Sequence, residues 1–194
     1  MTRPSLDCFK DNSALSVAKF LLGMELCTKI DGKLTSGIIV ETEAYGGAND
    51  RASHSFNNKR TKRTEPMFLA GGAIYVYLCY GIHNMFNIVT NKKNVPEAVL
   101  IRAIEPVDGI DIMLGRLGST IKKKLGSGPG KLTKSLGITT EFSGKKLGQN
   151  IWIENDKPRC FDIGSGKRIG VDYAGIDAKL QWRFFIKNNS WVSK

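Results

Sequence analysis

Histidine and cysteine are scarce in this chain of 194 residues, which has two of the first and four of the second. No two cysteines show the Cys-x-x-Cys spacing of a metal or redox pair. His54 and His83 lie far apart in the sequence, and no carboxylate stands beside either at ligand spacing, so a zinc or iron site is poorly supported. We therefore expect no metal and no cofactor.

Several enzyme signatures are missing as well. No glycine pattern of a dinucleotide-binding fold follows a predicted strand. No nucleophile elbow marks a Ser-His-Asp triad, although the triad itself stays open. No run approaches the roughly 20 apolar residues that span a membrane, and the first residues lack the apolar core of a secretion signal. We expect a cytoplasmic protein that does not bind membranes.

Acidic residues are few relative to basic ones, 18 against 29, which gives a formal net charge of +11. Such an excess is typical of a protein with a polyanionic partner. The cations lie in loop-like segments such as 59–63, 122–124 and 145–146. None forms a basic amphipathic helix, which favours nucleic acid over a membrane surface. A lysine-rich surface that merely solvates the protein is the alternative.

The length predicts one domain, residues 1–194. Hydrophobic periodicity predicts helices at residues 11–22 and 107–117 and a short helix after the loop 127–131. Strands are predicted at residues 24–30, 35–43, 73–79, 84–90 and 99–104, with short ones near 150–154, 167–172 and 182–187. Asp31-Gly32 predicts a hairpin turn between the first two strands, and residues 46–72 read as a long loop.

The strongest functional signals gather between residues 41 and 87. Four of the five tyrosines and both histidines lie there, together with acidic residues and a basic run. Stacking rings, an acid and cations are what a site for a flat, polar heterocycle needs. Strand alternation places Glu41, Glu43 and Tyr45 on one face, where Glu43 could act as a general base for water. A solvated or salt-bridged glutamate is the plainer alternative.

Three residues besides Glu43 are also expected to contact a partner group. Tyr80 stands at the tip of a predicted hairpin, where an exposed aromatic invites a contact, although it could instead fold back onto the core. Arg102 interrupts an apolar strand and so needs an anionic or carbonyl partner. Lys131 follows a glycine-rich loop at a helix start, which suits a phosphate and equally suits a plain turn.

A series of short motifs extends along the chain, and it opens on Glu43-Ala44-Tyr45 and Ser53-His54-Ser55. It continues through Met67-Phe68, Tyr75-Val76-Tyr77, Tyr80-Gly81, Asn87, residues 99–106, residues 127–132, residues 168–171, Ala174-Gly175 and residues 190–193. Taken together and in this order, these motifs resemble the alkyladenine (3-methyladenine) DNA glycosylase family, the methylpurine glycosylases. The resemblance covers nearly the whole chain, and the composite is far more specific than any single signal above.

The resemblance implies a mixed α+β domain with a curved, largely antiparallel β-sheet, flanking helices and a protruding hairpin that inserts into DNA. This fold is similar to the C-terminal domain of methionyl-tRNA formyltransferase. The implied activity is that of a monofunctional DNA repair glycosylase, of a bacterial-type minimal form that acts as a monomer on the nucleoid. Such an enzyme flips 3-methyladenine, 7-methylguanine, hypoxanthine or ethenoadenine out of duplex DNA. A Glu-activated water then hydrolyses the N-glycosidic bond and leaves an abasic site.

The family's catalytic roles fall on three positions of this sequence. Glu43 matches the acid that deprotonates water, Arg102 matches the arginine that helps hold that water, and Val171 matches a backbone carbonyl contact to it. One departure is the segment 46–51, which has more glycine than the family pattern and precedes His54. A non-catalytic DNA- or RNA-binding protein on the same scaffold is the alternative, and it would have no need of the acid.

The binding roles fall on six further positions. Tyr45, His54 and Tyr77 match the side chains that stack on the extruded base, and Asn87 matches one that screens the edge of the purine. On the DNA itself, Tyr80 matches the wedge that fills the gap left by the flipped nucleotide. Lys131 is the expected phosphate contact.

Overall fold

The computed structural model describes residues 3–121, 125–155 and 160–193. Its centre is an eight-stranded sheet with the order β3-β4-β5-β2-β1-β6, extended by β8 beside β2 and by β7 beside β8. All of the described strand pairs are antiparallel. The strands are β1 (Glu25–Ile30), β2 (Lys33–Tyr45), β3 (Ile74–Cys79), β4 (His83–Thr90), β5 (Glu97–Pro106), β6 (Ile151–Glu154), β7 (Ile163–Gly166) and β8 (Arg183–Ile186).

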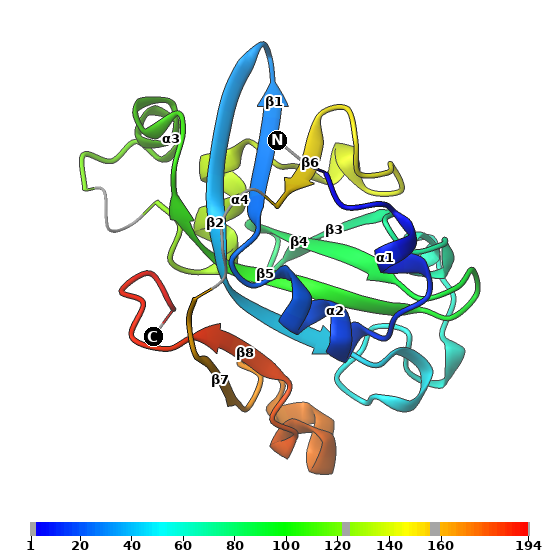
Figure 1. Ribbon diagram of the computed structural model, residues 1–194. Helices are drawn as coiled ribbons and strands as arrows, with labels where there is room; N and C mark the ends of the chain where they lie inside the picture. The colour runs from blue at the N-terminus through cyan, green and yellow to red at the C-terminus, as the bar shows by residue number, and fades with distance from the viewer. Residues whose placement is uncertain (1–2, 122–124, 156–159, 194) are drawn as a thin grey trace.

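The long strand β2 holds the sheet together and runs as a curved ribbon through the molecule (Figure 1). One edge of β2 pairs with β5, while the other edge pairs first with β1 and then, from Glu41 to Glu43, with β8. The register against β5 shifts on both sides of Glu41, which marks a bulge. A bulge bends a strand and re-aims its side chains, so the end of β2 leaves the first hairpin and turns toward β8.

The two faces of the sheet differ in composition because side chains alternate along each strand. Phe86, Ile88, Val99 and Ile101 point to the main hydrophobic core. The helix α2 (Ala14–Leu21) packs on that face, and the Thr42 hydroxyl donates to the Ala18 carbonyl at 2.9 Å. The residues that alternate with them point to the opposite face, where aliphatic side chains such as Leu100 are mixed with Asn87, Arg102 and several tyrosines, and they form the site described below.

The remaining helices are α1 (Asp7–Lys10), α3 (Ile110–Leu117) and α4 (Pro129–Leu136), with the short 3-10 helices η1 (Gly47–Asn49), η2 (Phe56–Asn58), η3 (Glu65–Phe68), η5 (Thr140–Phe142) and η6 (Asp172–Lys179). Of these, α4 also packs against the sheet, where it contacts β4 and β5, and the others are spread over the molecule (Figure 1). The start of α4 lies against the β3–β4 hairpin, where the Thr133 hydroxyl donates to the Asn84 carbonyl at 2.8 Å. No helix in the described part of the chain is long and apolar enough to cross a bilayer.

The predicted mixed α and β architecture with an antiparallel sheet is confirmed, and most predicted elements lie within a few residues of their places. The hairpin turn at Asp31-Gly32 is also present, and both residues have positive φ. The short helix α1 was not predicted, and the segment 46–72 contains three 3-10 helices rather than an unstructured loop. The likeness to the formyltransferase domain and the extent of one domain over residues 1–194 stay predictions, and the lysines 122–124 lie outside the described residues.

The strand predicted near residues 167–172 is wrong. The strand of this region is β7, which ends at Gly166, and residues 167–171 form an irregular segment. This segment forms no strand because its polar groups bind side chains of the site and not the backbone of a neighbouring strand. The Arg168 side chain is buried against Asp50, and the Ile169 amide donates to the Glu43 carboxylate at 2.7 Å.

Candidate functional site

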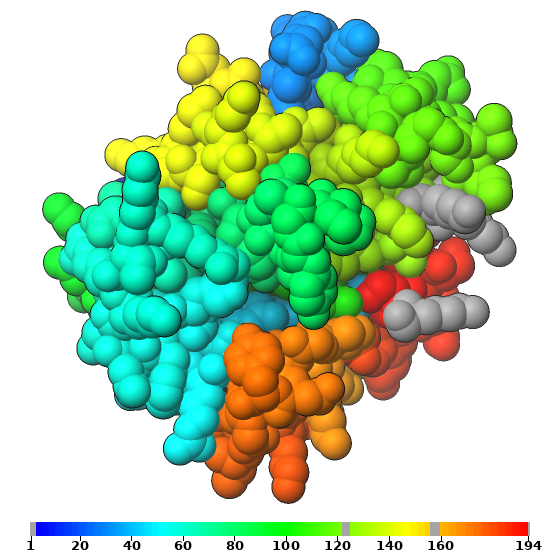
Figure 2. All heavy atoms as spheres, turned by 180° about the vertical axis from the view of Figure 1, so that it is seen from behind, coloured from blue at the N-terminus to red at the C-terminus, as the bar shows by residue number. Residues whose placement is uncertain are grey.

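The face of the sheet opposite the main core borders a cavity of about 470 Å³, a size typical of small-molecule sites. Figure 2 shows the hollow between the β3–β4 hairpin, η6 and the segment 46–72. One side of the cavity, here called the strand wall, is made of alternate residues of neighbouring strands: Tyr45, Tyr75, Tyr77, Met85, Asn87, Ala98, Leu100 and Arg102. The other side, the loop wall, comes from irregular segments: Ala52, Ser53, His54, Arg63, Ile169, Gly170, Val171 and Tyr173.

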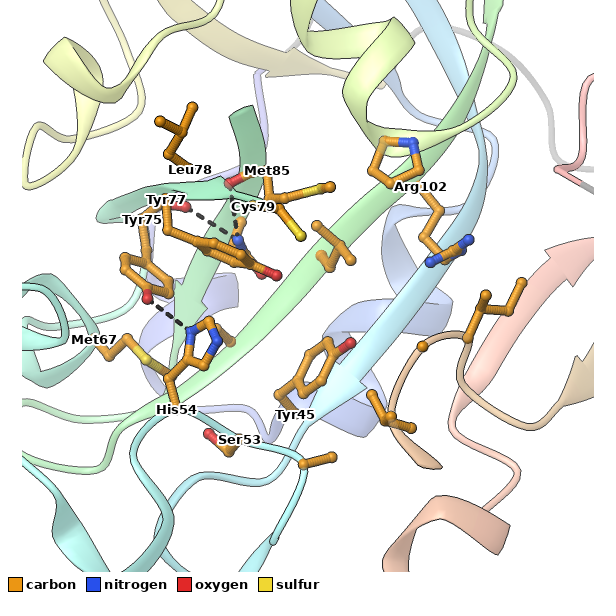
Figure 3. A pocket seen from close by; sticks show the side chains of 18 of the residues that line it. Tyr45, Ser53, His54, Met67, Tyr75, Tyr77, Leu78, Cys79, Met85 and Arg102 are labelled. Atoms are coloured by element: carbon orange, nitrogen blue, oxygen red, sulfur yellow. Dashed lines mark hydrogen bonds between the residues drawn. The ribbon is translucent and has the colours of Figure 1, made fainter. Parts of the chain in front are cut away.

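Tyr45, His54, Tyr75 and Tyr77 are four of the six aromatic side chains that line the cavity; the others are Tyr80 and Tyr173. Figure 3 shows Tyr45, from β2, across the pocket from the group formed by His54, Tyr75 and Tyr77. The centroids of Tyr75 and Tyr77 are 5.4 Å apart with their planes tilted by 33°, and His54 meets Tyr77 edge-on at 4.6 Å. Rings held on both sides of an open space form a stacking site for a flat ligand.

His54 is held by both of its ring nitrogens. Its Nδ1 lies 2.9 Å from the Tyr75 hydroxyl, and its Nε2 lies 3.5 Å from an Arg63 nitrogen. A guanidinium can only donate, so Nε2 accepts and Nδ1 carries the proton that it donates to Tyr75. Burial and the Arg63 charge lower the pKa of His54 to about 4. The ring is therefore uncharged at neutral pH.

Glu43 is completely buried behind the ring of Tyr45. Its Oε2 accepts a hydrogen bond from the Tyr45 hydroxyl at 2.8 Å, and its Oε1 lies 3.3 Å from Arg102 Nη1 in addition to the bond from Ile169. Burial raises the pKa of Glu43 above its usual range, while Arg102, the Ile169 amide and the Tyr45 hydroxyl all act in the opposite direction. The donors around the carboxylate stabilise its ionised form in a place that water scarcely reaches.

A second buried carboxylate, Glu41, lies on the same face as Glu43, as the strand alternation predicts. Its oxygens accept from Arg102 Nε at 3.1 Å, Arg183 Nη1 at 3.0 Å and the Ser193 amide at 2.7 Å. Arg102 thus bridges the two glutamates. Its position in an apolar strand predicted an anionic partner, and the structure provides two. Because its oxygens are engaged away from the cavity, Glu41 has a structural role in holding Arg102.

A buried ion pair between Arg168 and Asp50 joins the two halves of the loop wall. Arg168 Nη2 lies 2.8 Å from Asp50 Oδ1, and Nη1 also donates to the Ala44 carbonyl at 3.0 Å. Asp50 in turn accepts from the amides of Gly46 and Ala52, each at 3.0 Å. The glycine-rich segment before His54 is therefore fixed by side-chain hydrogen bonds, although its sequence departs from the family pattern.

The structure places the other predicted residues around this centre. Asn87 is buried on β4, where its amide nitrogen donates to the carbonyls of Tyr75 and Met85, so its carbonyl oxygen is the group left for a ligand. Val171 is buried in the loop wall, and its carbonyl accepts from the Ala174 amide at 2.9 Å. A carbonyl oxygen has two lone pairs, so one remains for a further contact.

Tyr80 stands at the rim of the cavity in the turn between β3 and β4. It is 90% exposed and has a φ of 51°, so the alternative in which it folds back onto the core is wrong. Lys131 is exposed in the first turn of α4, and the preceding Gly130 packs against the His83 ring in the hairpin, where a Cβ would approach to 2.9 Å. Tyr80 and Lys131 are therefore both on the outside of the molecule.

Sequence reasoning assigned no role to Tyr75, Arg63, Arg168 or the Ile169 amide. Tyr75 could have been found, because it precedes Tyr77 by two positions and so shares its face. Arg63 lay unmarked within a basic run. Ile169 lies 126 residues after Glu43, and no spacing rule connects positions so far apart. In the described part of the chain, no cluster of three or more His, Cys, Asp or Glu side chains could hold a metal ion.

A ring-lined pocket above a buried carboxylate–arginine pair, with an exposed aromatic hairpin at its rim, is typical of a protein that binds a flat heterocyclic ligand. The comparisons with known proteins agree. The model of the family described as "Methylpurine-DNA glycosylase (MPG)" matches residues 8–190. This chain belongs to the methylpurine-DNA glycosylase family, and it is a monofunctional DNA glycosylase, a hydrolase of DNA base-excision repair.

Several curated relatives cover almost the full length of the chain. A protein of Clostridium novyi named "Putative 3-methyladenine DNA glycosylase" is 44% identical over 195 residues, which is 96% of each chain. Proteins with the same name are 46% identical over 195 residues in Alkaliphilus oremlandii, again 96% of each chain, and 45% identical over 180 residues in Chlamydia felis, 92% of this chain and 93% of that protein.

Proposed function

We propose that this enzyme flips alkylated or deaminated purines out of duplex DNA and hydrolyses their N-glycosidic bonds with a water activated by Glu43. Its substrates are 3-methyladenine, 7-methylguanine, hypoxanthine and ethenoadenine, and its product is an abasic site. The observation that carries the proposal is the position of the buried Glu43, which contacts both Arg102 and Tyr45 in the lining of a cavity rich in aromatic rings. A protein that only bound DNA would gain nothing from burying that acid beneath a base-sized pocket.

In this proposal, the base lies between Tyr45 on one side and His54 with Tyr77 on the other. Each stack of a base on an aromatic ring is worth roughly 1–3 kcal/mol, which offsets part of the cost of unstacking the base from the duplex. The remaining carbonyl oxygen of Asn87 faces the edge of the purine and discriminates between substituents there. The pocket is broad because stacking tolerates many ring substituents.

The chemistry follows from the charges at the pocket floor. Loss of the base passes through a sugar with oxocarbenium character, so the Glu43 carboxylate stabilises the developing positive charge. The same carboxylate accepts a proton from the attacking water, which the Arg102 guanidinium and the Val171 carbonyl hold in place. Since the ionised form is the base, we expect the excision rate to fall as the pH falls through the pKa of Glu43, which burial raises above its usual range.

The exposed hairpin supplies the contact with the duplex. Tyr80, at its tip, enters the minor groove and fills the gap left by the flipped nucleotide. Lys131 contacts a phosphate of the same DNA from the start of α4. The excess of basic residues then provides the salt-dependent attraction that precedes recognition of a lesion.

The test is release of base by the wild-type protein. Duplex oligonucleotides with one hypoxanthine or one ethenoadenine would be incubated with excess enzyme and then cleaved with hot alkali at abasic sites, and an undamaged duplex would be the control. Methylated genomic DNA, assayed for free 3-methyladenine, would extend the range. We expect strand cleavage only after alkali. Binding to DNA without release of any base would contradict the proposal and favour a non-catalytic binder.

A further inference from the structure

Each of the two tyrosines on opposite sides of the pocket has an arginine against its ring. The Arg168 guanidinium carbon lies 4.9 Å from the ring centroid of Tyr45, and that of Arg63 lies 5.1 Å from the ring centroid of Tyr77. These rings are therefore already engaged with cations before any base arrives. A cationic ligand would gain less from their faces than it would from unoccupied rings.

The two arginines differ in how their charges are balanced. Arg168 is buried and paired with Asp50. Arg63 is exposed, lines the cavity, and forms no ion pair with a carboxylate within the described residues. Its polar contacts include His54 Nε2, which accepts its hydrogen bond and carries no charge at neutral pH, and the Tyr75 hydroxyl. Arg63 thus brings an uncompensated positive charge to the base site.

The other charges near the base are balanced. Glu43 is opposed by Arg102, which also serves Glu41, and Asp50 is opposed by Arg168. The charge that an incoming base meets at the loop wall is therefore that of Arg63. Like charges at close range repel each other.

We propose that Arg63 is a specificity-determining residue that favours uncharged damaged purines over cationic N-alkylated purines. The inference rests on the proposed function, because it assumes that the damaged base occupies this cavity. It deepens that function by naming the preferred substrate class. Arg63 penalises a base that carries a formal positive charge and leaves a neutral base of similar shape unaffected.

Hypoxanthine and 7-methylguanine form a suitable pair of probes. Both are 6-oxopurines, but 7-methylguanine is cationic within DNA and hypoxanthine is neutral. Single-turnover rates, measured with enzyme in excess of the DNA but below saturation, would give kcat/KM for each lesion in the same duplex sequence. Removing the charge in Arg63→Gln is expected to raise the ratio of 7-methylguanine to hypoxanthine excision roughly tenfold. Arg63→Lys retains the charge and should keep the ratio within about twofold of wild type.

Arg60 offers a matched control in the same basic run. It also lies over an aromatic ring, that of Phe68 at 4.7 Å, but it is paired with Glu65 and does not line the cavity. Arg60→Gln should therefore leave the ratio unchanged. If both arginine variants slow the two lesions equally, Arg63 acts as a general DNA contact and the inference is wrong.

Binding separates this inference from the proposed function. Dissociation constants of the Glu43→Gln variant for the two damaged duplexes, with and without Arg63→Gln, report the charge preference without chemistry. If wild type releases neither base but the binding ratio still shifts toward the cationic lesion, the proposed hydrolysis fails and the Arg63 inference stands. If wild type releases base and neither ratio changes, the inference fails alone.

An NMR titration tests the position of Arg63 independently of substrate. Because the Arg63 charge contributes to the lowered pKa of His54, Arg63→Gln should move the pKa of His54 upward and Arg60→Gln should not. A His54 titration that is the same in Arg63→Gln and wild type would contradict the placement of the guanidinium against the ring.

Discussion

The strand wall and the loop wall of the pocket are held in place by different interactions. Residues such as Tyr77, Asn87 and Arg102 stand on strands whose backbones are fixed by ladders of hydrogen bonds. His54 and Ile169 stand on irregular segments that are held by a few polar contacts, among them the buried ion pair between Arg168 and Asp50. The strand wall is therefore robust to the loss of a single side chain, whereas the loop wall depends on a few polar contacts.

Breaking the Arg168–Asp50 pair should have the largest effect on stability. Arg168→Met leaves the Asp50 carboxylate buried without its countercharge, which typically costs about 3–5 kcal/mol in the free energy of unfolding. We expect this loss in urea denaturation. We also expect excision to fall in the molecules that remain folded, because the segment carrying Ile169 and Val171 loses its anchor.

Arg183→Met is the matched control on the strand side. Arg183 also pairs with a buried glutamate, but Glu41 keeps its bonds to Arg102 and Ser193 when Arg183 is removed. The expected loss is smaller, roughly 1 kcal/mol. Equal losses in the two variants would contradict the view that the Arg168–Asp50 pair is more important for the loop wall than any one ion pair is for the strand wall.

Tyr80→Ala tests the hairpin, which belongs to neither wall. Loss of one aromatic–base stack, worth about 1–3 kcal/mol, should slow excision from duplex DNA about tenfold or more while salt-dependent binding to undamaged DNA stays as in wild type. The same lesion in single-stranded DNA leaves no gap to fill, so the variant and wild type should differ little there. Unchanged excision from the duplex would remove the wedge role of Tyr80.

The smallest effect concerns the pH dependence of stability. The ordinary pKa of histidine is near 6.5, and that of His54 in the fold is lowered to about 4. Between these values the unfolded chain binds a proton that the folded chain does not, so the neutral His54 loses its stabilising effect as the pH falls through this window. Thermal melts should show a shallower decline of Tm between pH 6.5 and 4 in His54→Gln than in wild type.

His83→Gln is the control for removing a histidine, since His83 is exposed in the hairpin. It should retain the wild-type slope over the same pH range. A His54→Gln variant whose Tm declines as steeply as that of wild type would mean that other groups cause the acid sensitivity. Gross unfolding of His54→Gln at neutral pH would instead show that His54 is a core residue of the loop wall.

The contrast between the strand wall and the loop wall also explains which parts of the site the sequence could predict. Alternation alone places Glu43 with Glu41, and Tyr75 with Tyr77, because a strand repeats every two residues. Local signals also locate the Asp31-Gly32 turn and the exposed tip at Tyr80. The bond from Ile169 to Glu43 and the pair between Arg168 and Asp50 join residues 126 and 118 positions apart, and no local pattern encodes such contacts.

The incorrect strand near residues 167–172 has the same origin. Arg168-Ile169-Gly170-Val171 looks like an amphipathic strand when read locally. In the fold, the Arg168 guanidinium pairs with Asp50 and the Ile169 amide donates to Glu43, so neither group takes part in a sheet. The loop wall is thus the part of the site where tertiary contacts override local preference.

The central claim, that Glu43 performs the chemistry beneath a base-binding pocket, is tested most directly by Glu43→Gln beside Glu41→Gln. Both glutamates are buried and both contact Arg102, but only Glu43 is expected to activate water. Single-turnover excision and the dissociation constant would be measured on one hypoxanthine duplex. We predict that Glu43→Gln lowers the rate by about a thousandfold or more with little change in binding, and that folded Glu41→Gln retains far more activity. Near wild-type excision by Glu43→Gln would contradict the claim.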